Sequence, residues 1–355
     1  MSGGRRRRGK LLVGAVAGAV LATGIGLYAT DSWPFRNAYC WGAWQENSGA
    51  YFLGEDALAK SGSERRGTES APPSAERQNA TCTVEVSSTV DDSDSDEPLT
   101  FKESVTVDYG PVPAEAGKRR AWMARYFHGS ASPLPDSLDG LVGSDRAMLV
   151  LPEACDVDGR PSAVTIRSES WGDGHLGRRA MPFSIGTRPD VARMLLEVAN
   201  AGMEKAGCAP DDPLRMTSPM VTVAEDDESA REPLCRIPGV TFEFGVADRY
   251  EQQVGAVNDE LQTCSVVWRS RGEPDEPAAQ YVMASAPRMA ALFAGLPEGA
   301  DKGLVRATCN GRETVFYADV RGGLRSSASP SLDGAFANFV ESVGNRIGCG
   351  TGGEA

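Results

Sequence analysis

The sequence predicts a membrane-anchored α+β protein, with one N-terminal transmembrane helix followed by two tandem disulfide-stapled α+β units. Each unit is expected to contain a β-hairpin and a closing helix. Three observations predict this organisation. An apolar segment follows a cluster of arginines near the N-terminus, all eight cysteines come after that segment, and the surroundings of the first four cysteines recur around the last four.

The anchor is the first element. Residues 11–30 contain no charged side chain, and a helix of twenty residues spans roughly 30 Å, the thickness of the hydrocarbon core of a bilayer. Four arginines and Lys10 precede it, so the positive-inside bias places residues 1–10 in the cytoplasm. A cleaved signal peptide is the alternative, but its apolar region would be only about 7 to 15 residues long. We therefore expect a single-pass plasma-membrane protein whose C-terminal region is extracytoplasmic.

Small residues line one face of the predicted transmembrane helix. They are spaced by four and are Gly14, Gly18, Ala22 and Gly26. Such spacing lets two helices in a membrane approach closely, which favours a homodimer or a membrane partner. The alternative is that an Ala- and Gly-rich segment contains this spacing by chance.

The charge balance limits the partners of the outer region. The chain of 355 residues has a net charge of −13, and its ten-residue basic tail leaves about −18 for the rest. An acidic surface repels phosphate polymers, so neither nucleic acid nor an anionic envelope polymer is an expected partner. Metal cations, basic peptides and basic proteins are better electrostatic matches, although the charge also serves solubility alone.

Eight cysteines follow the anchor, and none forms a Cys-x-x-Cys pair. Zinc sites usually take closely paired thiolates, and the chain has only two histidines, so no metal site is expected. The extracytoplasmic compartment permits oxidation, which predicts four structural disulfides. The cysteines are Cys40, Cys82, Cys155, Cys208, Cys235, Cys264, Cys309 and Cys349.

The strands and turns around these cysteines occur twice. Cys82 and Cys264 each lie in a short segment rich in β-branched residues, which predicts a strand. A hairpin turn follows the third cysteine of each set, because Asp-Gly and Asn-Gly favour the two-residue turn with positive φ. The turns are Asp158-Gly159 and Asn310-Gly311, and the strands expected after them are 163–168 and 314–320.

A helix is expected before the last cysteine of each set. Its apolar stripe has the same spacing in both copies and ends at Gly207-Cys208 and at Gly348-Cys349. The stripes are Leu195, Val198, Ala199, Gly202 and Ala206 in the first copy and Phe336, Phe339, Val340, Val343 and Ile347 in the second. The parallel indicates an internal duplication. It favours the pairs Cys40–Cys82, Cys155–Cys208, Cys235–Cys264 and Cys309–Cys349, among the three connectivities that four cysteines allow.

These observations give the domain boundaries. The first unit covers residues 36–208, an acidic linker covers 209–234, and the second unit covers 235–349. Two polar stretches, 60–79 and the acidic run 91–97, are interpreted as insertions in the first unit. The acidic run lacks the glycine of a calcium loop, so we interpret it as a solvated loop.

The sequence contains no motif that indicates an enzyme. It has neither the nucleophile motif of acyl-transfer enzymes nor a phosphate-binding loop, and no cofactor is expected. Only His128 and His175 could serve as the base of a Ser-His-Asp triad. His128 follows an aromatic segment where packing is the default role, and His175 lies in a glycine-rich loop.

The anchor, the excess of arginine over lysine and the paired-cysteine units resemble those of membrane-anchored extracytoplasmic proteins of actinobacteria. This resemblance implies no particular activity. We expect a tandem binding module outside the membrane, with a groove at matching places in both units. The alternatives are a cell-envelope hydrolase with a carboxylate pair, and an accessory or sensor subunit of a membrane complex.

Overall fold

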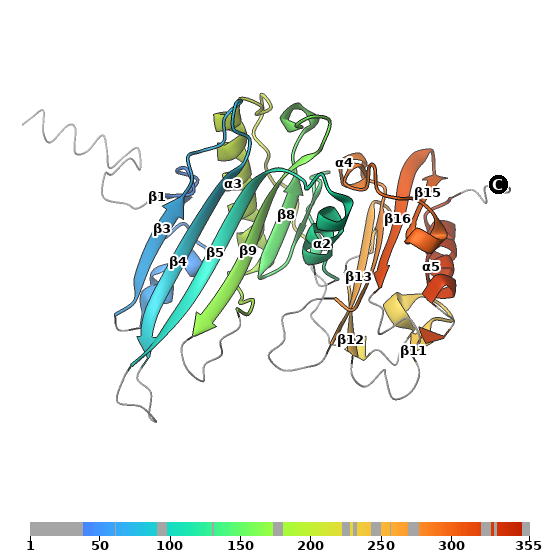
Figure 1. Ribbon diagram of the computed structural model, residues 1–355. Coiled ribbons are helices and arrows are strands. Elements are labelled where there is room, and N and C mark those ends of the chain that lie inside the picture. Colours follow the sequence, from blue (N-terminus) through green and yellow to red (C-terminus); the bar gives the residue numbers. More distant parts are fainter. Residues whose placement is uncertain are drawn as a thin grey trace, which may run out of the picture. The chain divides into compact units, whose positions relative to one another are not determined.

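A computed structural model (Figure 1) describes the chain from residue 38 onwards, with gaps. Residues 39–355 form one compact unit. The basic tail, the expected transmembrane helix 11–30 with its glycine face, the acidic run 91–97 and His175 lie outside the described residues. No helix of the described part is long and apolar enough to cross a bilayer. The described residues are 38–60, 62–90, 98–129, 131–172, 180–221, 228–229, 233–242, 250–255, 257–268, 277–320, 328–329 and 332–349.

The N-terminal half, residues 38–221, is built around a sheet of seven strands, which we call the first sheet. Its strands are β3 (Glu64–Glu69), β4 (Ala80–Val90), β5 (Leu99–Pro111), β6 (Ser132–Pro133), β7 (Gly140–Val142), β8 (Arg146–Val150) and β9 (Ser162–Gly172). Its helices are α2 (Ala116–Tyr126) and α3 (Arg188–Ala206). A small ladder of β1 (Ala38–Tyr39) and β2 (Trp44–Gln45) and the 3-10 turns η1 (Tyr51–Leu53), η2 (Glu55–Leu58) and η3 (Glu153–Cys155) complete this half.

The C-terminal half, residues 228–349, is built around a sheet of six strands, the second sheet. Its strands are β10 (Glu228–Ser229), β12 (Tyr250–Val254), β13 (Leu261–Trp268), β14 (Ala279–Ala284), β15 (Leu304–Cys309) and β16 (Arg312–Val320). Its helices are α4 (Pro287–Ala291) and α5 (Leu332–Arg346). The strands β11 (Thr241–Phe242) and β17 (Ala328–Ser329) pair separately, and η5 (Leu234–Arg236) and η7 (Ala300–Lys302) are 3-10 turns.

The two sheets share one strand order. The first runs β3-β4-β5-β9-β8-β7-β6 and the second runs β10-β12-β13-β14-β16-β15, and the neighbouring strands are antiparallel. Five strands therefore correspond: β3 to β12, β4 to β13, β5 to β14, β9 to β16 and β8 to β15. A helix follows the third strand in both halves, since α2 lies between β5 and β6 and α4 lies between β14 and β15, and a longer helix closes each half. The chain is thus an α+β protein made mostly of sheet.

Backbone conformations agree between the halves at the positions that the sequence singles out. The hairpin turns have positive φ at both residues, 52° and 71° at Asp158-Gly159 and 48° and 78° at Asn310-Gly311. These values are those of the two-residue turn that fits the twist of a hairpin, so the predicted turns are confirmed. The first cysteine of each set also has positive φ, 53° at Cys40 and 56° at Cys235.

Four disulfides connect the eight cysteines, and the described part of the chain contains no free cysteine. They are Cys40–Cys82, Cys155–Cys208, Cys235–Cys264 and Cys309–Cys349, the pairs that the sequence favours. In each half, one bridge fastens the segment before β3 or β12 to the neighbouring strand, β4 or β13, and the other fastens the hairpin to the end of the closing helix.

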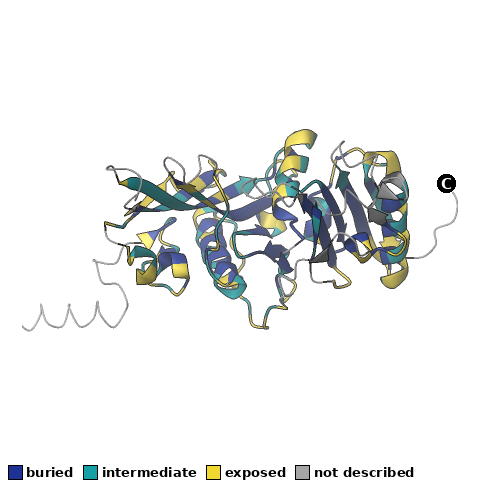
Figure 2. Ribbon diagram, turned by 90° about the horizontal axis from the view of Figure 1, so that it is seen from below, coloured by how far each residue is buried: buried dark blue, intermediate teal, exposed yellow. Residues whose placement is uncertain are grey.

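Each closing helix covers one face of its own sheet. A capping box of Thr187 and Asp190, with Pro189 in the first turn, starts α3, and Gly207 in the left-handed conformation ends it. The stripe that contains Leu195 and Val198 shares a core with the strand residues on that face of the sheet, such as Ile166. In α5, Phe339 packs against Tyr281 and Phe316. Figure 2 shows both helices buried on one side and exposed on the other.

The opposite faces of the two sheets contribute to a shared core, which we call the seam. Met148 and Val150 come from the first sheet, and Val282 and Tyr317 come from the second. The helices α2 and α4 lie between the sheets (Figure 1) and add residues such as Met123 and Met289. The seam explains why the two sheets belong to one compact unit.

Backbone also crosses the seam. The Gly129 N–H donates to Ser265 Oγ at 2.9 Å, and a Cβ on Gly129 would lie 1.8 Å from the Gln253 carbonyl oxygen. Only glycine allows this approach. Gln280 Nε2 donates to the Phe127 carbonyl at 2.5 Å, which ties the end of α2 to the second sheet.

Two polar segments differ from their interpretation as insertion and linker. Residues 64–69 form β3, which pairs with β4, although 60–79 is predicted to be a flexible insertion. The reason is that β3 is an edge strand with mostly exposed side chains, so it lacks apolar alternation. Part of the acidic linker packs onto the N-terminal half through Leu214 and Met216, and Thr217 N–H donates to Asp136 Oδ2 at 2.5 Å.

Candidate functional site

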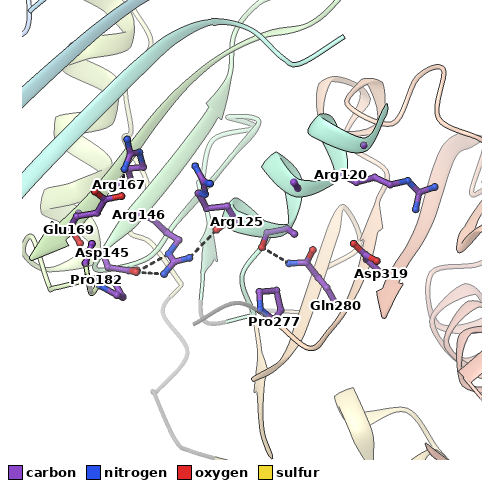
Figure 3. A pocket seen from close by; sticks show the side chains of 15 residues that line it. Arg120, Arg125, Asp145, Arg146, Arg167, Glu169, Pro182, Pro277, Gln280 and Asp319 are labelled. Atoms are coloured by element: carbon purple, nitrogen blue, oxygen red, sulfur yellow. Dashed lines mark hydrogen bonds and ion pairs between the residues drawn. The ribbon is translucent and has the colours of Figure 1, made fainter. Parts of the chain in front are cut away.

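A pocket of about 480 Å³ opens beside α2, between the first and second sheets (Figure 3). Its volume lies within the range of roughly 300–1,000 Å³ that is typical of small-molecule sites. Both halves line it. The residues are Gly117, Arg120, Ala121, Ala124 and Arg125 from α2; Asp145, Arg146, Arg167, Ser168, Glu169, Ala180 and Pro182 from the first sheet and its loops; and Pro277, Gln280 and Asp319 from the second sheet.

The residues of α2 that line the pocket lie on one face of the helix. Residues 117, 120, 121, 124 and 125 recur at intervals of three and four and therefore share one face. Three of them are glycine or alanine, which leaves room for the cavity, whereas Arg120 and Arg125 carry charge. Met123 and Tyr126 lie on the other side of the helix and are buried in the seam. The amphipathic helix thus brings two guanidinium groups to the pocket.

A buried arginine fixes α2 to the C-terminal half. Arg119 donates from Nε to the Pro113 carbonyl at 2.7 Å and from Nη1 to the Ala294 carbonyl at 2.5 Å. These bonds satisfy a guanidinium that is 6 % exposed. They hold the helix, and with it the pocket face, against the loop that follows α4.

The first sheet contributes two ion pairs to the wall. Arg146 donates to Asp145 Oδ2 from Nε at 2.8 Å, and its Nη1 donates to the Arg125 carbonyl at 3.1 Å. A cation is favourable at that carbonyl because it lies at the C-terminal end of α2. Arg167 pairs with Glu169, two residues farther along β9. Each of these carboxylates therefore has a cation beside it.

The second sheet contributes acceptors. Gln280 on β14 and Asp319 on β16 are register partners on neighbouring strands. Gln280 is only 1 % exposed, and its Oε1 has no hydrogen-bond partner within the described part of the chain. An amide oxygen buried at a pocket wall accepts a hydrogen bond readily, since leaving it unpaired costs about 1–3 kcal/mol.

The charges of the pocket sum to one positive charge in a chain whose net charge is −13. Four arginines face three carboxylates. Arg120 donates to the Lys302 carbonyl at 3.3 Å and lies over the Tyr317 ring, and Arg146 and Arg167 pair with acids. The Arg125 guanidinium is exposed and makes no hydrogen bond or ion pair to another described residue. It is the group best placed to receive an anion.

The residues that the sequence singles out for chemistry lie elsewhere. No cysteine lines this pocket. His128 follows α2 and is 3 % exposed, and burial lowers its pKa to about 4, so it is neutral at pH 7. His175 lies outside the described residues. Within the described ranges, no three metal-binding side chains come close enough together to hold a metal ion.

The pocket differs from the expected groove in two ways. It is lined by residues of both halves, whereas grooves at matching places in each unit were expected, and it is basic rather than apolar or acidic. The sequence does contain a signal, since Lys118-Arg119-Arg120 and Arg125 form a local basic cluster in an acidic chain. Its partners Gln280 and Asp319 are far away in the sequence, and pairing across the seam cannot be recognised from local patterns.

No family model, no curated protein and no solved structure matches this chain. The pocket geometry therefore carries the functional argument.

Proposed function

We propose that this chain is a binding module displayed outside the plasma membrane, and that its pocket takes a small polar ligand with one anionic group. The observation that carries the proposal is the pocket beside α2. There, four arginines and the unpartnered Gln280 Oε1 surround a cavity of about 480 Å³. Arginine suits this role because its planar fork binds a carboxylate through two parallel hydrogen bonds.

Membrane display is supported by the sequence. A cluster of four arginines precedes the uncharged segment 11–30, and every cysteine follows that segment. The four disulfides support an oxidising compartment for residues 39–355. A homodimer or a membrane partner bound through the glycine face of residues 14–26 remains part of the proposal.

We also infer that the two halves arose by internal duplication. The support is the common strand order, the equivalent disulfides and the matching turn conformations. In this view, two units in tandem pack their sheets against each other at the seam, and the pocket lies between them.

Binding is favoured over hydrolysis by the state of the acids. Carboxylate-pair hydrolysis needs one protonated acid and one free carboxylate. In the pocket, Asp145 is ion-paired with Arg146, and Glu169 is ion-paired with Arg167. Both carboxylates are thus occupied by guanidinium groups of the chain itself. An accessory or sensor role would use the same module, with its output passing through the transmembrane helix.

The test uses the full chain in nanodiscs of phosphatidylcholine, a lipid without net charge. Isothermal titration compares small carboxylates such as lactate and glucuronate with neutral analogues. Arg125→Gln removes the unpaired cation and should weaken binding of the anions at least tenfold, about 1.4 kcal/mol or more. Arg215→Gln is the matched control, because Arg215 is exposed and does not line the pocket.

Two results would overturn the proposal. One is that no carboxylate binds the full chain at millimolar concentration. The other is that Arg125→Gln and Arg215→Gln bind the anions equally well, which would place the site elsewhere.

A further inference from the structure

An exposed tryptophan lies on the strand that forms one wall of the pocket. Trp171 is 39 % exposed and is one of five exposed large apolar side chains in the described ranges. Isolated exposed apolar residues are common, but an indole ring beside a polar cavity is informative. Met181, which is also exposed, bridges to Ser170, and its neighbours Ala180 and Pro182 line the pocket.

The register of β9 places Trp171 on the pocket side of the first sheet. The pairing with β5 runs without interruption from Ser162 to Gly172, so alternate residues share a face. Arg167, Glu169 and Trp171 therefore point the same way. Two residues of a strand span about 7 Å, so the indole ring follows directly after the pocket wall.

The sheet beside the ring is polar. The residues of β5 opposite Trp171 and Glu169 are Lys102 and Ser104. Lys102 is held by Glu85 at 3.0 Å, and Ser104 Oγ donates to the Glu169 carbonyl at 3.3 Å. The indole ring therefore lies next to hydrogen-bonding groups of the same sheet.

The charge balance limits the ligand further. Arg146 and Arg167 pair with acids, and Arg120 donates to the Lys302 carbonyl and lies over Tyr317. The pocket therefore offers one guanidinium without a partner in the described part, that of Arg125. This suits a single carboxylate better than a dianionic phosphate. Gln280 Oε1, Asp319 and Glu169 are acceptors, so the rest of the ligand must supply several donors. Hydroxyl groups around a ring with one apolar face meet both requirements.

We propose that the ligand is an acidic saccharide of one or two rings. Its carboxylate pairs with Arg125, its hydroxyl groups donate to Gln280 and Glu169, and the apolar face of a sugar ring stacks on Trp171. This inference rests on the proposed function and narrows the ligand class. Stacking uses the large flat surface of the indole ring, which is otherwise exposed to water.

The experiment titrates the full chain in phosphatidylcholine nanodiscs with four probes. These are cellobiouronate, a disaccharide with one carboxylate; cellobiose, its neutral analogue; lactate, a carboxylate without a sugar; and adenosine monophosphate. We expect cellobiouronate to bind at least tenfold more tightly than each of the other three.

Two aromatic variants separate stacking from general destabilisation. Trp171→Ala should weaken binding of cellobiouronate at least fivefold and leave binding of lactate unchanged. Tyr51→Ala is the matched control, because Tyr51 is an exposed aromatic residue that does not line the pocket. Thermal melting of both variants checks that the fold is retained.

Each outcome is decisive. If lactate binds as tightly as cellobiouronate, or if Trp171→Ala has no effect, the saccharide inference fails while the anion pocket stands. If cellobiose binds as tightly as cellobiouronate, the carboxylate contact is wrong. Tighter binding of adenosine monophosphate would make the ligand a nucleotide. If no probe binds, both the inference and the proposed function fail.

Discussion

The two halves share a strand order, equivalent disulfides and a closing helix, which together we call the framework. They differ in the helix that faces the seam. In the N-terminal half this helix, α2, has 11 residues, and in the C-terminal half its counterpart, α4, has five. The longer helix carries a small-residue face with Arg120 and Arg125 beside a cavity, whereas α4 buries Met289 and Ala290 in the seam. The equivalent connection therefore lines a cavity as well as packing in the seam in one half, and only packs in the other.

This difference indicates where new function can arise in a repeated fold. The disulfides and closing helices keep each sheet intact, so the connection after β5 or β14 is free to vary. Lengthening its helix by about two turns exposes a helical face to the space between the sheets. The stability that the framework provides can be tested separately from the sequence of this connection.

The largest expected effect comes from the disulfides that clamp the closing helices. We expect Cys155→Ala with Cys208→Ala, and Cys309→Ala with Cys349→Ala, each to cost roughly 4 kcal/mol of unfolding free energy in the chain-entropy model. The bridges span 53 and 40 residues, so the two losses should be similar. Urea unfolding followed by tryptophan fluorescence measures both. A negligible loss in one half only would contradict their equivalence.

The framework is also the part that the sequence predicts well, because its signals are local. Asp158-Gly159 predicts a turn because both residues tolerate positive φ. The apolar stripe before Cys208 predicts the buried face of a helix from residue spacing alone. The strand β3 could not be predicted, because edge strands need little apolar alternation. The pocket depends on α2 meeting Gln280 and Asp319, a contact that only the packing of two sheets creates.

The seam itself provides the next test. Gly129→Ala would place a Cβ 1.8 Å from the Gln253 carbonyl oxygen, so backbone must move. We expect a loss of about 1–3 kcal/mol, typical of overpacking. Gly117→Ala is the control, because a Cβ there meets nothing within 4 Å and alanine stabilises a helix by about 1 kcal/mol relative to glycine. Thermal melting of the two variants should therefore shift in opposite directions. Equal shifts would show that the approach of Gly129 to the second sheet is not tight.

The smallest expected effect is electrostatic and lies at the other end of the seam. Burial raises the pKa of Asp139 to about 6, with Glu260 adding to the rise and Arg288 opposing it. Arg288 donates to Asp156 at 2.9 Å and to the Leu151 carbonyl at 2.7 Å, so it already binds the N-terminal half.

A carboxyl whose pKa is higher in the folded state than in the unfolded state favours folding when protonated. Stability contributed by Asp139 should therefore rise as the pH falls from 7 towards 4, by roughly 1 kcal/mol after solvent screening of a partly buried group. His128 acts in the opposite direction, because its pKa is lowered by burial.

The measurement is thus the difference between wild type and Asp139→Asn in urea unfolding at pH 7 and pH 5. Asparagine keeps the shape and removes the charge, so the variant should be the more stable protein at pH 7 and lose about half of that advantage at pH 5. A constant difference across this range would mean that Asp139 is not buried against the C-terminal half, and the seam would then be looser around α4 than around α2.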